Sequence, residues 1–364
     1  MTKEYVSLGL MSGTSGDGID ASVIQSDGEK DYKVILNEYF EYSPNIHQKI
    51  HSLKDKINNL KDLNSLSEEL KQLEKTITLF HAKVANDILN NSKQNIDLIG
   101  FHGQTIYHRA AEKISKQLGD GQLLSQLTKK NIIFNFREND IKHGGEGAPL
   151  TPIFHKLLKE KFKVDNVAFI NIGGIINETI FSNNTMSARD LGPGMCLIDQ
   201  WIRKNSKKNF DIDGSIAKSG NINKIILNQS LENYYENLQN LNKDFNISYD
   251  TNDFDLSFIR GLSLADGAAT LVEFTAQIIS TRFSKENKKI ILCGGGRKNK
   301  YLVERIKKFH PDLKFIDDYG INGDFIESQA FAFLSIRSLL GLNISFPNTT
   351  GCKNPCTGGI LVKY

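Results

Sequence analysis

The 364-residue sequence has few cysteines, almost no excess of charge and no long apolar run. Four cysteines are too few for a disulfide framework in a chain of this length. The 45 basic and 42 acidic residues nearly cancel, which argues against a nucleic-acid partner. No stretch reaches the roughly 18 apolar residues of a membrane span, and no apolar leader follows Met1. We therefore expect a cytoplasmic protein that binds neither nucleic acid nor membranes.

Two of the cysteines, Cys352 and Cys356, lie close together in the segment "GCKNPC". Their spacing suits a pair of metal ligands, but no second pair of cysteines or histidines completes a set of four. We interpret this segment as a loop with incidental thiols.

The chain is longer than a single hydrophobic core usually grows, which favours two lobes with a cleft between them. The predicted elements agree, because a series of strands and helices occurs twice. The first series has strands at 5–10, 19–24, 32–40, 96–101 and 131–136, and helices within 46–89 and at 150–160. The second has strands at 167–172, 175–181 and 289–293, and helices at 195–204, 262–283, 299–309 and 326–340. We expect two similar α/β lobes, 1–145 and 146–325, with 325–364 packing back on the first.

A glycine-rich turn joins the first two predicted strands, in "GLMSGTSGDG". A dinucleotide fingerprint is excluded because a strand, not a helix, follows, and the chain contains no Walker P-loop. The residues Gly13, Gly16 and Gly18 allow backbone amides to converge on an anion, with the hydroxyls of Thr14 and Ser15 beside them. The turn is therefore a candidate phosphate site, and a hairpin turn without a chemical role is the alternative.

Two more glycine motifs change the balance between these alternatives. "NIGGIIN" places Gly173 and Gly174 between two strands, and "LCGGGRKN" places Gly294, Gly295 and Gly296 after a strand, with Asn299 at the next helix. Together the three motifs predict two phosphate-binding hairpins, one in each lobe, and a flat glycine surface for the adenosine of a nucleotide.

This arrangement resembles the actin, sugar kinase and Hsp70 superfamily, in which ATP binds between two lobes of one basic fold. Within it, the sequence is similar to the anhydro-N-acetylmuramic acid kinase family. The similarity is carried, in the family's order and over almost the whole chain, by "GLMSGTSGDGIDA", "GFHGQTIYH", "FREND", "GGEGAPLTPIFH", "NIGGIINET", "DLGPGMCLIDQW", "DGSIAKSG", "LCGGGRKN" and "ESQAFAFLSIR". The resemblance implies a two-lobed, actin-like (ribonuclease H-like) ATPase fold with the nucleotide in the interlobe cleft.

The resemblance also implies a reaction in the recycling of cell-wall sugars. Members of the family open the anhydro bond of 1,6-anhydro-N-acetylmuramic acid with water and transfer the γ-phosphoryl group of ATP to O6, giving N-acetylmuramic acid 6-phosphate. Asp190 stands at the position of the family's catalytic aspartate and is the candidate base for the water. We expect it to lie beside amides at a helix start that can orient an anion. A helix N-cap is the alternative role.

Asp17 in the first turn is the candidate ligand for Mg²⁺ between the β- and γ-phosphates, because Gly18 beside it permits close approach. The alternative is a turn aspartate that accepts hydrogen bonds from its own backbone. Asp20 is expected to lie along the strand, outside the site.

Five residues are candidates for contact with the sugar: His102, Gln104, Arg137, Glu146 and Glu327. His102 and Gln104 follow a strand and offer donors to hydroxyls or to the N-acetyl group, whereas Arg137 suits the lactyl carboxylate or the phosphates. A buried, satisfied histidine and a surface ion pair are the respective alternatives. Glu146 lies on a loop with Gly147 and Ala148 that could line the same cleft.

The sequence departs from the family pattern at Gly16, Asn135, Leu191 and Met195, where leucine, aspartate, threonine and asparagine are usual. The family's Pro-Lys-Ser-Thr-Gly segment is replaced by "ISYDTNDFDLSFI". These changes put the identity of the sugar in doubt more than the binding of ATP. A nucleotide-binding protein without sugar turnover and a kinase for another sugar are therefore the alternatives, and a homodimer is one expected assembly.

Overall fold

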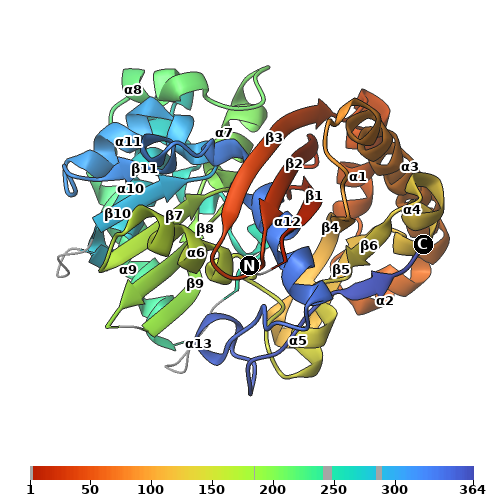
Figure 1. Cartoon of the computed structure of the whole chain (residues 1–364). Helices are drawn as coiled ribbons and strands as arrows, with labels where there is room; N and C mark the ends of the chain where they lie inside the picture. Colours follow the sequence, from red (N-terminus) through yellow and green to blue (C-terminus); the bar gives the residue numbers. More distant parts are fainter. Residues whose placement is uncertain (1–2, 184, 241–247, 284–288) are drawn as a thin grey trace. The chain divides into compact units, whose positions relative to one another are not determined.

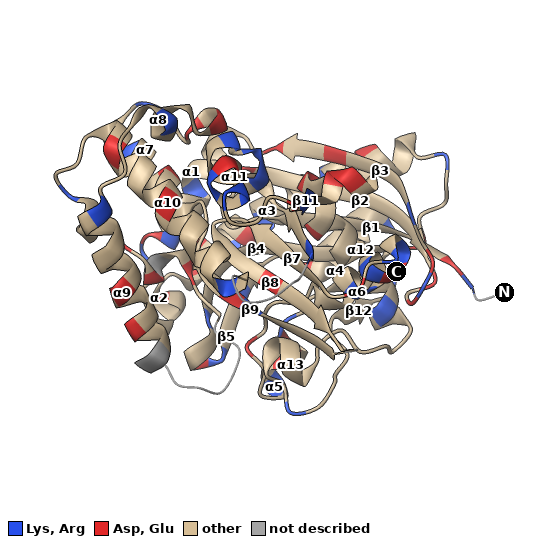
Figure 2. Cartoon of the chain, turned by 90° about the vertical axis from the view of Figure 1, so that its left-hand side faces the viewer, with Lys and Arg blue, Asp and Glu red and all other residues tan. Residues whose placement is uncertain are grey.

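The computed structural model describes residues 3–183, 185–240, 248–283 and 289–364, which form two compact units. The first unit is Met1–Lys161 with Phe325–Tyr364, and the second is Phe162–Asp324 (Figure 1). Residues 146–161, assigned to the second lobe from the sequence, belong to the first compact unit. In both units Lys and Arg are interspersed with Asp and Glu (Figure 2).

The first unit is built on a sheet in the order β12-β6-β4-β1-β2-β3, with β5 paired to β4. Strands β1, β2 and β3 form an antiparallel meander, and β4 runs parallel to both β1 and β6. Their bounds are β1 Tyr5–Ser12, β2 Gly18–Ser26, β3 Tyr32–Glu41, β4 Leu98–Arg109, β5 Ile114–Leu118, β6 Asn131–Phe134 and β12 Ile360–Val362. The meander was predicted, whereas β5 and the extension of β4 to Arg109 were not.

Helices cover both faces of this sheet. They are α1 Pro44–Lys54, α2 Leu60–Ser65, α3 Ser67–Asn91, α4 Gly121–Thr128, α5 Glu138–Lys142, α6 Pro152–Phe162, α12 Ile326–Leu339 and α13 Pro347–Thr350. The alternation of β1 sends Leu8 and Leu10 into the core with α1 and α3. On the opposite face Ser7 bonds Ser335 of α12 at 2.8 Å.

Glycine in the strands lets α12 lie close to the sheet. A Cβ atom at Gly9 would lie 2.0 Å from the carbonyl oxygen of Ser328, and one at Gly100 would lie 2.4 Å from that of Phe331. The last long helix of the chain is therefore part of the first unit, in contact with its central strands.

The second unit repeats this strand pattern in a sheet of order β11-β10-β7-β8-β9. An antiparallel meander is again followed by strands parallel to its first member. The strands are β7 Val167–Ile172, β8 Ile175–Ser182, β9 Thr185–Pro193, β10 Lys289–Cys293 and β11 Lys314–Phe315. The helices are α7 Cys196–Asn205, α8 Ser215–Ser219, α9 Lys224–Asn240, α10 Leu264–Phe283 and α11 Lys300–Lys307. The prediction of two α/β lobes of one basic fold is confirmed, although β9 and α9 were missed.

No helix in the described part of the chain is both long enough and apolar enough to cross a membrane.

Candidate functional site

The first glycine turn, residues 13–17, connects β1 to β2 and is braced from β4. Gly16 has a φ of +64°, and its amide donates to the carbonyl of Gly13 at 3.1 Å. Ser12 donates from Oγ to Oε1 of Gln104 at 2.6 Å, and Nε2 of Gln104 donates to the carbonyl of Gly13 at 2.9 Å. Gln104, expected to contact the sugar, instead holds the turn. The side chains of Thr14 and Ser15 are exposed beside it.

Asp17 keeps an accessible carboxylate in this turn. Its side chain is 59% exposed and forms an ion pair with Nε2 of His47 at 3.3 Å. A Cβ atom at Gly18 would lie 2.4 Å from the carbonyl of Phe40, so Gly18 is required for the approach of β3. The carboxylate oxygens that Mg²⁺ prefers are thus available, in competition with one histidine.

The second glycine turn, Gly173–Gly174, holds the start of α7 in place. The amides of Gly194 and Cys196 donate to the carbonyl of Gly174 at 2.9 and 3.2 Å, and the amide of Met195 donates to that of Gly173 at 2.9 Å. These amides had been expected to orient an anion beside Asp190. That expectation is wrong for these three groups, because the turn already accepts their hydrogens.

Asp190 lies in β9, directly opposite Asn177 of β8, and is 5% exposed. Its carboxylate accepts hydrogen bonds from Nδ2 of Asn177 and, at 2.8 Å, from the amide of Tyr249. The helix-cap alternative is wrong, since the N-cap of α7 is Met195. Burial, with the charge of Asp190, raises the pKa of Tyr249 to about 12.

Two of the residues that depart from the family pattern, Leu191 and Met195, pack in or against the hydrophobic core of the second unit. Leu191 is in the hydrophobic core, where its carbonyl accepts a hydrogen bond from Tyr234, and Met195 packs against the same core. The replaced segment supplies Tyr249, which donates to Asp190. Residues 241–247, which include the first residue of this segment, lie outside the described part of the chain.

The third glycine motif follows β10 and lies against the end of β7. Gly294 has a φ of +80°, and its Cβ would lie 2.2 Å from Oδ1 of Asn171. A Cβ at Gly296 would lie 2.3 Å from Ile172, whereas one at Gly295 would meet no atom within 4 Å. Only Gly295 therefore offers an open surface. Asn299, expected to contact the nucleotide, is buried and caps α11 by accepting from the amide of Leu302 at 2.9 Å.

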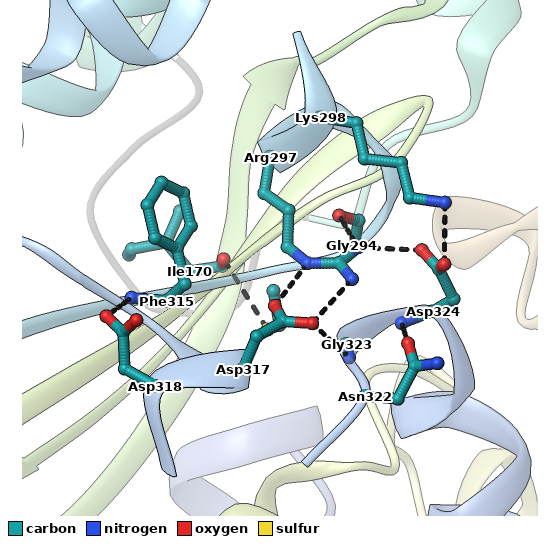
Figure 3. Close-up of polar contacts among 11 residues, drawn as sticks. Ile170, Gly294, Arg297, Lys298, Phe315, Asp317, Asp318, Asn322, Gly323 and Asp324 are labelled. Atoms are coloured by element: carbon teal, nitrogen blue, oxygen red, sulfur yellow. Dashed lines mark hydrogen bonds and ion pairs between the residues drawn. The ribbon is translucent and has the colours of Figure 1, made fainter. Parts of the chain in front are cut away.

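A buried arginine fixes this third motif, as Figure 3 shows. The guanidinium of Arg297 donates to both carboxylate oxygens of Asp317, at 2.7 and 3.0 Å, and to Asp324 at 2.7 Å. It also donates to the carbonyl of Gly294 at 3.0 Å. Hydrogen bonding to Arg297 lowers the pKa of Asp317. For Asp324, burial acts to raise the pKa, and the ion pairs with Lys298 and Arg297 outweigh it and lower the pKa.

His102 and Arg137 form a polar pair in the first unit. The guanidinium donates to Nε2 of His102 from Nε and Nη2 at 3.3 and 3.0 Å, so Nδ1 carries the histidine's hydrogen and bonds the carbonyl of Gly103 at 2.8 Å. Burial, with the charge of Arg137, holds the pKa of His102 well below its usual range. His102 is therefore neutral and orients Arg137.

A cavity of about 480 Å³ lies beside this pair. Its lining includes Phe101, His102, Phe134 and Asn135 near strand ends, with Lys113 and Lys116 from the β4–β5 connection and β5. The volume is within the range of small-molecule sites. Asn135 has a φ of +55°, which asparagine and aspartate tolerate best among residues with a side chain. Asparagine at position 135 therefore tolerates this backbone conformation, as the aspartate usual in the family would.

The remaining two candidates lie in the first unit. The amide of Glu146 donates to the carbonyl of Thr350 at 2.8 Å, and Glu327 occupies the first turn of α12. In the first unit, the predicted first turn is bonded to Gln104. In the second unit, the third glycine motif packs against the strand end that precedes the second. Sequence reasoning missed Asn177, Tyr249, Arg297 and Lys113. Of these four, only Asn177 could have been found from the sequence, because a predicted β9 would have been paired with β8 and would have placed Asn177 opposite Asp190.

The sequence matches the family model described as "Anhydro-N-acetylmuramic acid kinase" over residues 5–363. It is 52% identical to the anhydro-N-acetylmuramic acid kinase of Pelagibacter ubique, with all of both chains covered. It is 36% identical to the enzyme of the same name from Agrobacterium fabrum, again over both whole chains, and 35% identical to that of Zymomonas mobilis over 97% of this chain and 98% of that one. Among solved structures, component A of the (R)-2-hydroxyglutaryl-CoA dehydratase of Acidaminococcus fermentans has a TM-score of 0.42 at 11% identity, covering 92% of this chain and 99% of that chain.

Replacing Arg297 by methionine should destabilise the second unit by about 2–3 kcal/mol at neutral pH, because the substitution leaves two carboxylates without their shared partner. Both carboxyl groups have a pKa below their ordinary value of 3.8 in the folded chain. Their contribution is therefore complete above about pH 4 and is lost as the pH falls through the lowered values. Denaturant unfolding followed by the fluorescence of the single tryptophan, Trp201 in α7, reports on this unit.

The matched control is Lys298→Met, which removes an ammonium group on an exposed side chain that also contacts Asp324. It should change stability by less than about 1 kcal/mol. Equal effects of the two substitutions, or a loss in Arg297→Met that does not shrink at low pH, would contradict the role given to the buried guanidinium.

Proposed function

The chain belongs to the anhydro-N-acetylmuramic acid kinase family, whose members are ATP-dependent sugar kinases, and from this premise we propose that it opens 1,6-anhydro-N-acetylmuramic acid with water and phosphorylates O6. In this reaction the oxygen of water bonds to C1 as the C1–O6 bond breaks. The freed O6 attacks the γ-phosphorus of ATP, and ADP leaves. The product is N-acetylmuramic acid 6-phosphate.

Asp190 is the proposed base that takes the proton from the attacking water. The observation that carries this role is the buried carboxylate held from two sides, by the amide nitrogen of Asn177 and the backbone amide of Tyr249. A carboxylate fixed in this way cannot turn away from a bound water, which a general base must meet at hydrogen-bond distance. Because Asp190 lies in β9 and does not cap α7, its position does not depend on where that helix begins.

ATP, in our proposal, supplies the phosphoryl group and binds through the glycine motifs. The turn Gly13, Thr14, Ser15, Gly16, Asp17 and Gly18 would hold phosphate oxygens through its amides and exposed hydroxyls. The turn Gly173–Gly174 is the second proposed phosphate-binding turn, and the open surface at Gly295 suits the flat adenosine. Asn299, with Gly294 and Gly296, would support that surface from behind.

Mg²⁺ would neutralise charge on the β- and γ-phosphates when bound. Asp17 is the residue proposed to hold it, because its carboxylate is exposed and only one histidine competes for it. Binding of the ion would require Asp17 to leave His47 or to share its carboxylate.

The sugar is proposed to occupy the cavity beside His102. Arg137, oriented by neutral His102, suits the lactyl carboxylate. The cavity wall carries charges of both signs, from Lys113 and Lys116 and from Glu74, Asp120 and Glu138. Glu146 and Glu327 remain candidates for sugar hydroxyls, whereas Gln104 acts through the first turn. The burial of Leu191 and the retained backbone conformation at Asn135 favour the family's own sugar over a different one.

The purified protein with Mg-ATP and 1,6-anhydro-N-acetylmuramic acid in ¹⁸O-labelled water should form a product heavier by one water and one phosphoryl group. Mass analysis should find a single ¹⁸O atom at C1 and none in the phosphate, since O6 comes from the sugar. Label in the phosphate would mean that water attacks phosphorus instead. Absence of turnover despite ATP binding would favour a nucleotide-binding protein without sugar chemistry.

Asp190→Asn should lower kcat by about 10² to 10⁴, the usual loss on removing a general base, while the affinity for ATP changes little. The amide keeps the shape of the carboxylate but cannot accept a proton from water. Turnover and calorimetric ATP binding should be measured on the same preparation. Asp165→Asn, an exposed aspartate of the same unit, is the control and should retain full activity. Full activity in Asp190→Asn would remove it as the base.

Gly295→Leu should weaken ATP binding by at least about tenfold, because the new side chain would occupy the proposed adenosine surface. The fold should be unaffected, since nothing lies within 4 Å of a Cβ atom there. Gly296→Leu is the contrasting variant, because its side chain would enter Ile172 and should lower the melting temperature. Unchanged nucleotide affinity in a folded Gly295→Leu protein would show that the motif is only a turn between a strand and a helix.

A further inference from the structure

Two cysteines and an aspartate meet inside the first unit. The Sγ atoms of Cys352 and Cys356 and a carboxylate oxygen of Asp140 all lie within 4.8 Å of one another. All three side chains are buried. Cys352 and Cys356 precede β12, whereas Asp140 is in α5, more than two hundred positions earlier in the chain.

The surrounding backbone holds the carboxylate in a fixed orientation. Oδ2 of Asp140 accepts from the amide of Gly147 at 2.6 Å, and Oδ1 accepts from Oγ1 of Thr350 at 2.5 Å. A Cβ atom at Gly145 would lie 2.2 Å from Oδ2, so glycine is needed there for the close approach of the loop. Outer hydrogen bonds of this kind characterise carboxylates that bind metals.

Backbone hydrogen bonds also fix the segment that carries the two thiols. The amide of Cys356 donates to the carbonyl of Ser345 at 3.1 Å, and the amide of Lys353, between the cysteines, donates to the carbonyl of His143 at 3.0 Å. The C-x₃-C spacing is within the range of structural zinc sites. A divalent cation bound there would favour the thiolate forms of both cysteines.

We propose that Cys352, Cys356 and Asp140 bind a structural zinc ion. Two thiolates and one carboxylate suit the borderline-soft zinc ion and are poor ligands for Mg²⁺. Three of the four ligands of a tetrahedral site are in place, and a water molecule would supply the fourth. The third ligand could not be predicted from the spacing of the cysteines, because Asp140 comes from a distant segment.

The zinc ion would connect the end of the chain to a loop on the substrate side of the unit. Residues 143–147 of this loop include Gly144 and Gly145, whose carbonyls accept hydrogen bonds from Nζ of Lys113 at 3.0 and 3.2 Å. Lys113 lines the 480 Å³ cavity. The ion would thus stabilise one wall of that cavity, and its loss should raise the KM for the sugar more than it lowers kcat. Binding of zinc itself does not depend on the proposed reaction.

The test is the zinc content of the full-length protein, reduced, loaded with Zn²⁺ and freed of excess metal by gel filtration. Wild type should retain one zinc ion per chain by mass spectrometry. Cys352→Ser and Cys356→Ser should lose it, and Asp140→Asn should bind at least about tenfold more weakly. Cys196→Ser, a cysteine of the second unit, is the matched control and should retain the ion.

Loading wild type with Co²⁺ should produce a thiolate-to-cobalt charge-transfer band, which keeps the test decisive if a cysteine variant fails to fold. The number of reactive thiols, counted after denaturation, distinguishes the remaining outcomes. Four thiols and no retained metal would overturn the proposal and leave a hydrogen-bonded thiol pair. Two thiols that become four only after reduction would overturn it in favour of a disulfide. Zinc retained by the Cys352→Ser/Cys356→Ser double variant would place the ion elsewhere.

Discussion

Close approach of backbone to backbone, possible only at glycine, is the constraint on which both units depend. In the first unit, Gly9 and Gly100 allow α12 to contact the central strands, and the first turn is then braced by Gln104 from β4. In the second, Gly194 lies where a Cβ atom would be 2.4 Å from the carbonyl of Gly173, which joins the start of α7 to the turn after β7. Gly294 and Gly296 bring the third motif against the same strand end. These glycines therefore set the positions of polar groups, and within the third motif Gly295 alone leaves a surface open.

Local patterns in the sequence were enough to predict the glycine turns and most of the strands, but not β5 and β9. The alternation in β1 and β2 and the paired glycines after β7 each lie within a few residues, where side-chain spacing determines the structure. The partners of polar side chains could not be predicted in this way. Gln104 lies 91 residues from Gly13, and Thr350 lies 210 residues from Asp140, so the pairs are made by the fold and have no local pattern. Gln104 and Asn299, both predicted to contact ligands, are side chains that bond the protein's own backbone.

The electrostatic arrangement differs between the two units. In the first unit, the buried His102 is neutral and orients Arg137, whose positive charge therefore lies beside the cavity. In the second, Asp190 is stabilised by neutral donors, an amide side chain and a backbone amide, while the arginine at position 297 is paired with two other carboxylates. Asn177 and the backbone amide of Tyr249 thus hold the carboxylate of Asp190 in a fixed orientation, which the proposed role of a base requires.

The first unit contains both ends of the chain, whereas the second is one continuous segment. This has a consequence for synthesis on the ribosome. The second unit has all of its residues as soon as Asp324 emerges, but the sheet face with Gly9 and Gly100 cannot be covered until α12 follows. The N-terminal part therefore lacks the helix that covers this sheet face until the last forty residues follow, which departs from the usual order in which N-terminal domains fold first. A stop codon shortly before α12 would leave a complete second unit attached to an incomplete first one.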